Sequence, residues 1–274
     1  GGGASGFFSA IHFAEKNPGK KILILEAGKD VLSKVRISGG GRCNVTHACF
    51  DPKELVQYYP RGGKELLGSF IRFGPSETVE WFESHGIELK TEEDGRMFPL
   101  ANTSEVIIKK FVGLCHQHHI EVQVQQRAIS ISRKDGSWVI QTRSDTYTTE
   151  QLFIGSGSDQ RMWDLLAQLG HHIIQPVPSL FTFNIKDKGF NTLSGISVEN
   201  ASCDIVGTNF HAEGPLLITH WGVSGPAVLK LSAWAARYLF DCDYQFSIQI
   251  NWLLMDSIDA EKELIQIRLQ HQSK

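Results

Sequence analysis

Apolar residues recur along the chain with two spacings, one typical of helices and one typical of strands. Pro75 and the sequence Thr103-Ser104-Glu105 mark two helix starts. An Asp94-Gly95 turn predicts a hairpin over 86–99. The predicted helices lie at about 7–14, 52–59, 63–72, 75–85 and 105–114, and the predicted strands at 21–25, 120–133, 137–143 and 146–154.

From about residue 176 the pattern changes to a run of strand formers that ends near His220. Ser224-Gly225-Pro226 then predicts the start of a helix that carries apolar residues as far as Leu239. A further alternating strand and the beginning of another helix follow. The fold class is therefore α/β, with a Rossmann-like nucleotide-binding domain over 1–175 and an inserted, β-rich domain over 176–274.

The chain opens on a glycine loop, in which Gly1, Gly3 and Gly6 satisfy the G-x-G-x-x-G spacing of dinucleotide-binding proteins. The first glycine permits the tight turn, the second lets backbone N–H groups approach a pyrophosphate, and the third lets helix and strand pack closely. The following helix N-terminus favours the phosphate charge. An ordinary βα turn is the alternative, and it leaves the glycine spacing unexplained.

Glu26 ends the apolar strand that follows, twenty residues after Gly6. Its carboxylate can accept hydrogen bonds from the ribose hydroxyls of an adenosine and disfavours a 2′-phosphate, so FAD or NAD is expected rather than NADP. The buried strand that normally precedes such a loop is absent from this sequence, which also lacks an initial Met. We therefore expect a fragment, truncated at both ends.

The strands of 121–157 predict a β-meander that crosses over and returns through Gln151–Gly157 to the parallel sheet. An apolar strand that ends in small residues, here Gly155 and Gly157, places backbone against a ligand at its carboxyl end. Plain NAD dehydrogenases continue with further βα units instead. The meander therefore favours FAD over NAD.

Composition narrows the class of protein further. With 274 residues, 41% hydrophobic and 21% charged, the chain matches a soluble globular protein of one large or two ordinary domains. A net charge of −3 gives no reason to expect nucleic acid or a membrane as partner, which leaves a small-molecule substrate. The five cysteines form no CxxC pair or zinc spacing, which favours a reducing, cytoplasmic location and no metal site.

A second glycine-rich segment, Ser38-Gly39-Gly40-Gly41-Arg42-Cys43-Asn44, suits close approach to a ligand, because three consecutive glycines are costly to order. Arg42 is then expected to bind an anion or a flavin carbonyl, and a mobile surface loop is the alternative. Cys43 has no second cysteine at CxxC spacing, so a buried structural thiol is favoured over a redox nucleophile. In the segment His220–Pro226 a helix start could bind a substrate carboxylate, but a plain junction with Ser224 as cap and Trp221 in the core is favoured.

Three segments carry a resemblance to a known family: the glycine loop, Ile37–Thr46 and Gly214–Pro226. They resemble the bacterial NAD(P)/FAD-dependent oxidoreductases known as aminoacetone-oxidase-like or BaiN-like flavoproteins. The resemblance implies an FAD domain interrupted by a β-rich domain and completed by a C-terminal glycine-rich segment that is not found here. It also implies a set of cofactor contacts. These are Gly1, Gly3, Ala4, Ser5 and Gly6 on the pyrophosphate, Glu26 on the ribose, Lys34, Ser38, Gly39, Gly40 and Gly41 on the phosphate and flavin side, and the Ala128 backbone on the adenine.

The leading hypothesis is an FAD-dependent oxidoreductase that transfers hydride between flavin, NAD(P)H and a small organic substrate. Enone reduction and amine oxidation both stay open, and no catalytic acid or base is identified. The alternatives are an NAD-only dehydrogenase and a non-catalytic binding module of the same fold. The oligomeric state is not predicted.

Overall fold

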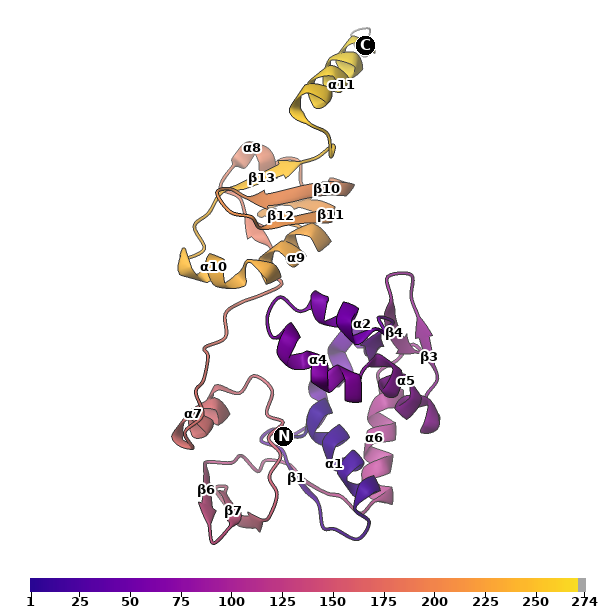
Figure 1. The fold of residues 1–274 in the computed structure, drawn as a ribbon, viewed down its shortest axis with the longest axis vertical. Helices are drawn as coiled ribbons and strands as arrows, with labels where there is room; N and C mark the ends of the chain where they lie inside the picture. Colours follow the sequence, from indigo (N-terminus) through magenta and orange to yellow (C-terminus); the bar gives the residue numbers. More distant parts are fainter. Residues whose placement is uncertain (271–274) are drawn as a thin grey trace. The chain divides into compact units, whose positions relative to one another are not determined.

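The structure is a computed structural model that describes residues 1–270 (Figure 1). The chain divides into two compact units, Gly1–Ile174 and Gln175–Lys274. Each unit has its own cluster of buried apolar residues. The mixed α/β class is confirmed, with helices and a short parallel sheet in the first unit and a larger antiparallel sheet in the second.

The first unit contains seven α-helices and eight strands within its described residues. The helices are α1 (Ala4–Lys16), α2 (Ser33–Gly41), α3 (Pro52–Leu55), α4 (Gly63–Arg72), α5 (Pro75–Ser84), α6 (Glu105–Gln117) and α7 (Gln160–Gln168), with a 3₁₀ turn η1 (Val56–Tyr58) after α3. The strands are β1 (Leu23–Leu25), β2 (Thr46–His47), β3 (Leu89–Thr91), β4 (Arg96–Pro99), β5 (Glu121–Gln123), β6 (Ser130–Lys134), β7 (Ser137–Gln141) and β8 (Thr146–Thr149).

These strands form three small sheets. β1 and β5 pair in parallel, β2, β4 and β3 form an antiparallel sheet in that order, and β6, β7 and β8 form the meander. The expected strand over 120–133 was wrong as a single element, because its first part pairs with β1 and only its last part joins the meander. The meander is therefore shorter than 121–157.

The expected returning strand in Gln151–Gly157 was also wrong, since these residues form no ladder with β1 or β5 in the described part of the chain. A strand exists only where its backbone groups pair with a neighbour. This segment instead runs past the glycine loop, where a Cβ built on Gly1 would lie 2.3 Å from the carbonyl oxygen of Gly155. The segment therefore lies beside the glycine loop without joining the sheet.

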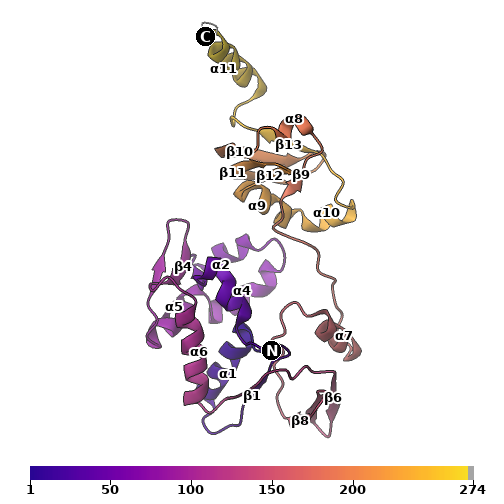
Figure 2. The ribbon, with the colours of Figure 1, turned by 180° about the vertical axis from the view of Figure 1, so that it is seen from behind.

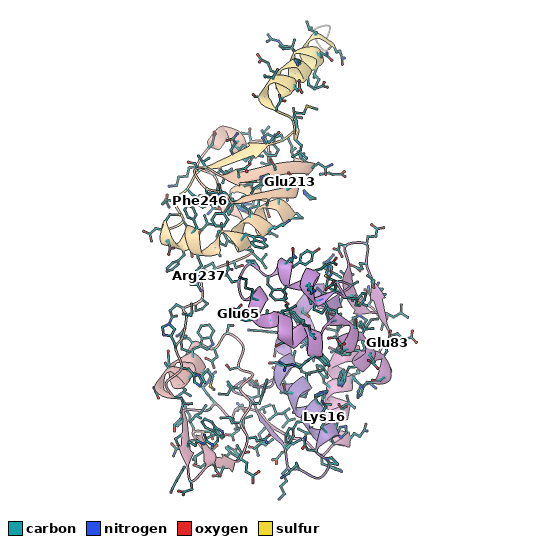
Figure 3. The ribbon with its side chains drawn as sticks, viewed as in Figure 1. Lys16, Glu65, Glu83, Glu213, Arg237 and Phe246 are labelled. Atoms are coloured by element: carbon teal, nitrogen blue, oxygen red, sulfur yellow. The ribbon has the colours of Figure 1, made fainter. Side chains whose placement is uncertain are left out.

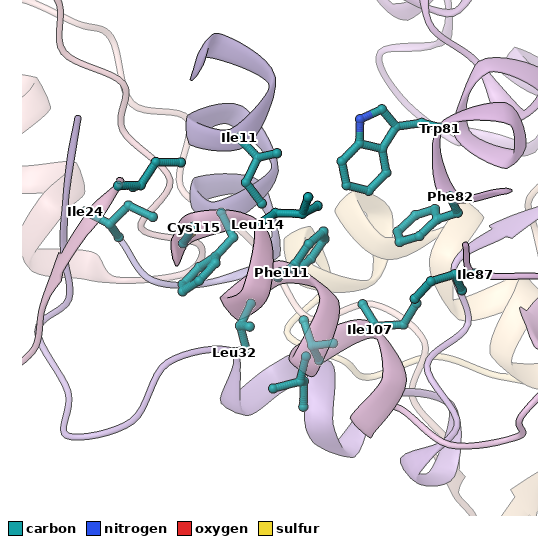
Figure 4. Packing of buried hydrophobic residues seen from close by; sticks show 14 of the residues in the cluster. Ile11, Ile24, Leu32, Trp81, Phe82, Ile87, Ile107, Phe111, Leu114 and Cys115 are labelled. Atoms are coloured by element: carbon teal, nitrogen blue, oxygen red, sulfur yellow. The ribbon is translucent and has the colours of Figure 1, made fainter. Parts of the chain in front are cut away.

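The core of the first unit lies between α1, α5 and α6 (Figure 4). Ile11 on α1 is fully buried and faces Phe111 and Leu114 on α6. The rings of Phe7 and Phe111 are stacked with centroids 6.3 Å apart. Burial of each such side chain contributes about 1.5–3 kcal/mol, so this contact fixes the direction of α1. The glycine loop at its start and Lys16 at its far end are thereby placed (Figure 3).

The second unit is built on one five-stranded antiparallel sheet in the order β13-β10-β11-β12-β9. Helix α9 packs on this sheet (Figure 2), with Leu216 of β11 and Val228 and Leu231 of α9 fully buried. The strands are β9 (Phe183–Asn184), β10 (Ser197–Ile205), β11 (His211–Thr219), β12 (Gly222–Ser224) and β13 (Ile248–Asn251). The helices are α8 (Lys188–Asn191), α9 (Pro226–Trp234), α10 (Ala236–Asp241) and α11 (Ser257–Gln270).

The single helix expected from Pro226 to Leu239 is divided into α9 and α10. The break falls at Ala235, whose φ and ψ of −86° and 4° leave the helical region. Ala235 is fully buried, so a small side chain sits where the chain bends against the sheet. Among residues 1–270, no helix has both the length and the apolar character needed to cross a membrane.

Candidate functional site

The glycine loop leads directly into the N-terminus of α1. Gly3 is the N-cap residue, with φ −89° and ψ −174°. Within the described residues no side chain caps the helix, and its first turn holds no acidic residue. The first N–H groups of a helix have no partner inside the helix and carry its positive dipole end. They are therefore available to an anionic group such as a pyrophosphate.

Close backbone contact explains why the first and sixth positions are glycine. A Cβ on Gly6 would lie 1.8 Å from the carbonyl oxygen of Gly1, and a Cβ on Gly155 would lie 3.0 Å from the Ser5 hydroxyl. The atoms that these Cβ atoms would meet belong to Gly1 and Ser5, both in the glycine loop. The loop therefore packs tightly on itself and on Gly155. Gly3 is different, because its Cβ would meet nothing within 4 Å. Open space at the middle glycine is what close approach of a ligand requires.

Glu26 joins the loop to the sheet. Its carboxylate accepts hydrogen bonds of 2.6 Å from the Gly2 N–H and 2.6 Å from the Gly28 N–H. The backbone of the 123–126 segment lies alongside, since the Gln126 N–H donates to the Glu26 carbonyl at 2.8 Å. Ala128 follows two residues later. The residues predicted for ribose and adenine therefore lie on adjacent segments, while their binding roles stay predictions.

Lys34 on α2 faces the end of the returning segment. Its Nζ donates to the Ser158 hydroxyl at 3.2 Å, and a Cβ on Gly157 would lie 3.7 Å from the same Nζ. Gly157 has a φ of +61°, which favours glycine. Lys34 and Gly157 are far apart in the sequence of the first unit, and the structure brings them together. A binding site that uses both residues requires this.

The second glycine run interrupts α2. Ser38 has ψ 147°, and Gly39, Gly40 and Gly41 have φ of +56°, +67° and +85°. Three consecutive positive φ values are accessible at low cost only to glycine. A Cβ on Gly40 would meet nothing within 4 Å, so the run presents bare backbone to open space. The Ser38 and Gly41 carbonyls on either side of Gly40 accept hydrogen bonds from the Cys43 and Ser104 N–H groups, as a defined loop conformation requires.

Comparison with known proteins assigns this arrangement to a family. A family model described as the HI0933-like protein Rossmann domain matches residues 1–224, and a second, described as the HI0933-like protein barrel and H2TH domain, matches 177–274. The chain belongs to the HI0933-like family. This confirms the resemblance to BaiN-like flavoproteins.

Three curated relatives are similar over most of this HI0933-like chain. A ribosomal RNA dihydrouridine synthase of Haemophilus influenzae is 27% identical over 85% of the chain and 59% of its own length. A 3-dehydro-bile acid delta(4,6)-reductase of Clostridium scindens is 24% identical over 98% of the chain and 65% of its own length. The ribosomal RNA dihydrouridine synthase of Escherichia coli is 24% identical over 99% and 66%. The chain therefore spans about three fifths to two thirds of these relatives.

In this HI0933-like site the Arg42 side chain turns to protein partners. Its Nη1 lies 2.5 Å from Glu92 Oε1, and its guanidinium carbon lies 4.0 Å from the centroid of the Phe98 ring. Sequence reasoning missed Glu92 and Phe98, because neither stands near the motif in the chain. The predicted contact of Arg42 with an anion or flavin carbonyl stays a prediction.

Cys43 is buried, as the favoured interpretation of a structural thiol expects. It is 8% exposed, and burial raises the pKa of its thiol, with a hydrogen bond from Ser38 opposing that shift. A raised pKa keeps the thiol protonated and unreactive at neutral pH. Its φ of +64° continues the left-handed turn begun by the glycines.

The junction between β11 and α9 differs from the favoured description in two respects, while carboxylate binding at the helix start stays a prediction. Trp221 is 42% exposed and donates to the Thr182 hydroxyl at 3.4 Å, so its assignment to the core was wrong. Gly225 rather than Ser224 is the N-cap of α9, so that assignment was wrong as well. Close packing of Gly222 and Gly225 against neighbouring backbone shapes this junction.

Proposed function

We propose that this chain forms the FAD-binding part of a flavin-dependent reductase of carbon–carbon double bonds. The observation that carries the proposal is the uncapped α1 N-terminus with open space at Gly3, closed on one side by Gly155 and on the other by Glu26. This cradle would hold the pyrophosphate of FAD against the first backbone N–H groups of α1. Membership of the HI0933-like family supports FAD as the group that fills it.

The residues that would hold FAD are grouped along one path through the first unit. The glycine loop would bind the pyrophosphate, Glu26 and the Ala128 backbone would bind the adenosine, and the left-handed run after Ser38 would line the flavin side. Lys34 would add one positive charge beside the phosphates. Bound FAD would supply hydride exchange, and the protein would orient the partners and exclude water.

The names of the relatives favour reduction over amine oxidation. Dihydrouridine is uridine with its ring double bond reduced, and the bile acid enzyme is named as a reductase. Both names describe hydrogen added to a double bond conjugated with a carbonyl. We therefore propose an enone-type acceptor, with NAD(P)H as electron donor.

A small-molecule enone is the first candidate substrate, because the net charge of −3 provides no overall attraction for a polyanion. Uridine in ribosomal RNA is the second candidate, and the names of two relatives favour it. RNA binding through a local basic surface would require strong salt dependence, which a small neutral enone does not.

The test uses the full-length protein that contains this chain. We expect a purified yellow protein whose visible flavin bands bleach when NADH or NADPH is added without oxygen. The reduced protein is then mixed with a steroid enone or with unmodified ribosomal RNA. Reoxidation by the enone supports the first substrate, and reoxidation with gain of two hydrogens on uridine supports the second. A colourless protein that binds NAD contradicts the flavin proposal.

A further inference from the structure

The Arg42 side chain is hydrogen-bonded to the glycine run that precedes it in the chain. Its Nε donates to the Gly39 carbonyl at 3.3 Å, while its Nη1 lies 2.5 Å from Glu92 Oε1. One planar guanidinium thus holds a backbone carbonyl and a carboxylate at the same time. Since the donors of arginine have a rigid geometry, fixing the carboxylate also fixes the carbonyl.

Glu92 is itself held in place. It begins the turn between β3 and β4, where its N–H donates to the Arg96 carbonyl at 2.8 Å and its carbonyl accepts from the Gly95 N–H at 2.9 Å. Its second carboxylate oxygen lies 3.6 Å from Arg96 Nη2. The Glu92 side chain is only 26% exposed. A hairpin fifty residues away in sequence therefore presents a fixed charge to Arg42.

Phe98 on β4 completes the contact. Its ring is fully buried, and a Cβ on Gly39 would lie 2.8 Å from its Cε1. The Arg42 guanidinium stacks over the same ring, and Figures 1 and 2 both show α2 beside β4. A guanidinium over an aromatic face contributes about 0.5–1 kcal/mol at a partly exposed site. Ring and guanidinium together determine where the Gly39 peptide lies.

We propose that Glu92, acting through Arg42 and Phe98, is a positioning residue for the Gly39–Gly41 run. The inference rests on the proposed function, since it concerns the run that would line the flavin. The Glu92 charge orients Arg42, Arg42 holds the Gly39 carbonyl, and the run keeps the left-handed conformation that bares its backbone. In this proposal Arg42 acts on the cofactor through the run.

Glu92→Gln separates this role from direct cofactor binding by Arg42. If Glu92 positions the run, loss of its charge weakens FAD binding, by about tenfold in Kd for an ion pair of this exposure. If Arg42 binds the cofactor directly, the same change frees the guanidinium, and FAD binds as tightly or more tightly. The two roles predict opposite directions for one substitution.

The experiment measures the Kd for FAD of the full-length protein by titration of the apoprotein. Glu93→Gln is the matched control, because Glu93 is the exposed neighbour in the same turn. Arg42→Lys keeps the charge but loses the fork, and we expect it to weaken binding as Glu92→Gln does. The double variant should bind no more weakly than Arg42→Lys alone, because both changes break one chain of contacts.

Hydrogen exchange gives a readout that does not need the cofactor. The Cys43 N–H donates to the Ser38 carbonyl at 3.0 Å, and the Ser104 N–H donates to the Gly41 carbonyl at 2.8 Å. We expect both amides to exchange faster in Glu92→Gln apoprotein and unchanged in Glu93→Gln. Unchanged exchange together with wild-type FAD affinity in Glu92→Gln overturns the inference. If the wild-type protein binds no FAD, the proposed function is overturned instead. Hydrogen exchange in the two variants still decides whether Glu92 positions the Gly39–Gly41 run.

Discussion

A side chain added at Gly40 in the first unit would meet open space, whereas one added at Gly222 in the second unit would lie 2.1 Å from the carbonyl oxygen of Phe183. Both glycines have positive φ, +67° and +150°. The chain itself fills the space beside Gly222, whereas a Cβ on Gly40 would meet no atom of the first unit within 4 Å. Close packing thus accounts for glycine at position 222, and the open space beside Gly40 is compatible with a ligand there.

The same distinction holds for their neighbours. A Cβ on Gly225 would lie 2.6 Å from the Pro215 carbonyl oxygen, so the glycines of the β11–α9 junction serve strand and helix packing. The Gly39–Gly41 run has one packed glycine, Gly39, followed by Gly40 in the open. Both segments carried the family resemblance equally well. We propose a binding surface only for the Gly39–Gly41 run.

Gly222→Ala should have the largest effect of the substitutions that test this comparison. The added Cβ clashes with backbone on β9, which has no flexible end to move, so we expect a loss of about 4 kcal/mol in the free energy of unfolding. Gly207→Ala is the control, because Gly207 has φ +79° but nothing within 4 Å. Its cost should be about 1–2 kcal/mol of backbone strain alone. Urea unfolding of the whole chain measures both, and equal losses would contradict the packing role of Gly222.

Gly40→Ala should have a smaller effect on stability and a larger one on the cofactor. Left-handed backbone costs alanine about 1–2 kcal/mol, and Gly19→Ala, at φ +84° with nothing within 4 Å, should cost the same. FAD affinity should fall about tenfold or more in Gly40→Ala only, because the methyl group occupies the face proposed for the flavin. Apoprotein titration and thermal unfolding are compared for the two variants. Equal FAD affinity in both would show that Gly40 does not face the cofactor.

Local signals predicted most of the helices and strands because each is encoded within a few residues. Pro75 marks the start of α5, and Asp94-Gly95 forms the turn between β3 and β4. Helix α7 was not predicted, although Asp159 caps it by accepting from the Arg161 N–H at 3.2 Å. An aspartate followed by apolar residues at helical spacing was the available signal.

What the sequence could not predict depends on pairs that are distant along the chain. The partners of Arg42 are Glu92 and Phe98, and no local pattern relates them to the glycine run. The division of 120–133 was missed for the same reason, because pairing of β5 with β1 decides it. Motif spacing therefore located the glycine loop and Glu26. The direction of the Arg42 side chain could be found only from the folded structure.

His211 provides the smallest and most local test in the second unit. Its Nδ1 lies 2.7 Å from Asp204 Oδ1 across the β10–β11 pair, and its Nε2 lies 3.1 Å from Glu213 Oε1 on its own strand. The hydrogen bonds to Asp204 and then Glu213 raise the pKa of His211 above its ordinary value of 6.5. A raised folded-state pKa means that protonated His211 stabilises the fold. This stabilisation is complete below about pH 6 and is lost as the pH rises through the folded-state pKa.

The size of the effect is limited by solvent, because the three side chains are 46%, 44% and 63% exposed. We expect His211→Gln to cost about 0.5 kcal/mol at pH 5.5 and nothing at pH 9. Urea unfolding of the wild type and the variant across this pH range measures the difference. If His211 stabilises only the sheet, as Gly222 does, we expect faster hydrogen exchange in the variant only in β10 and β11. The FAD affinity of the full-length protein should then not change. A stability difference that grows with pH contradicts the ion-pair account. An altered FAD affinity would mean that the second unit takes part in FAD binding. The close packing of Gly222 and Gly225 argues against such a role.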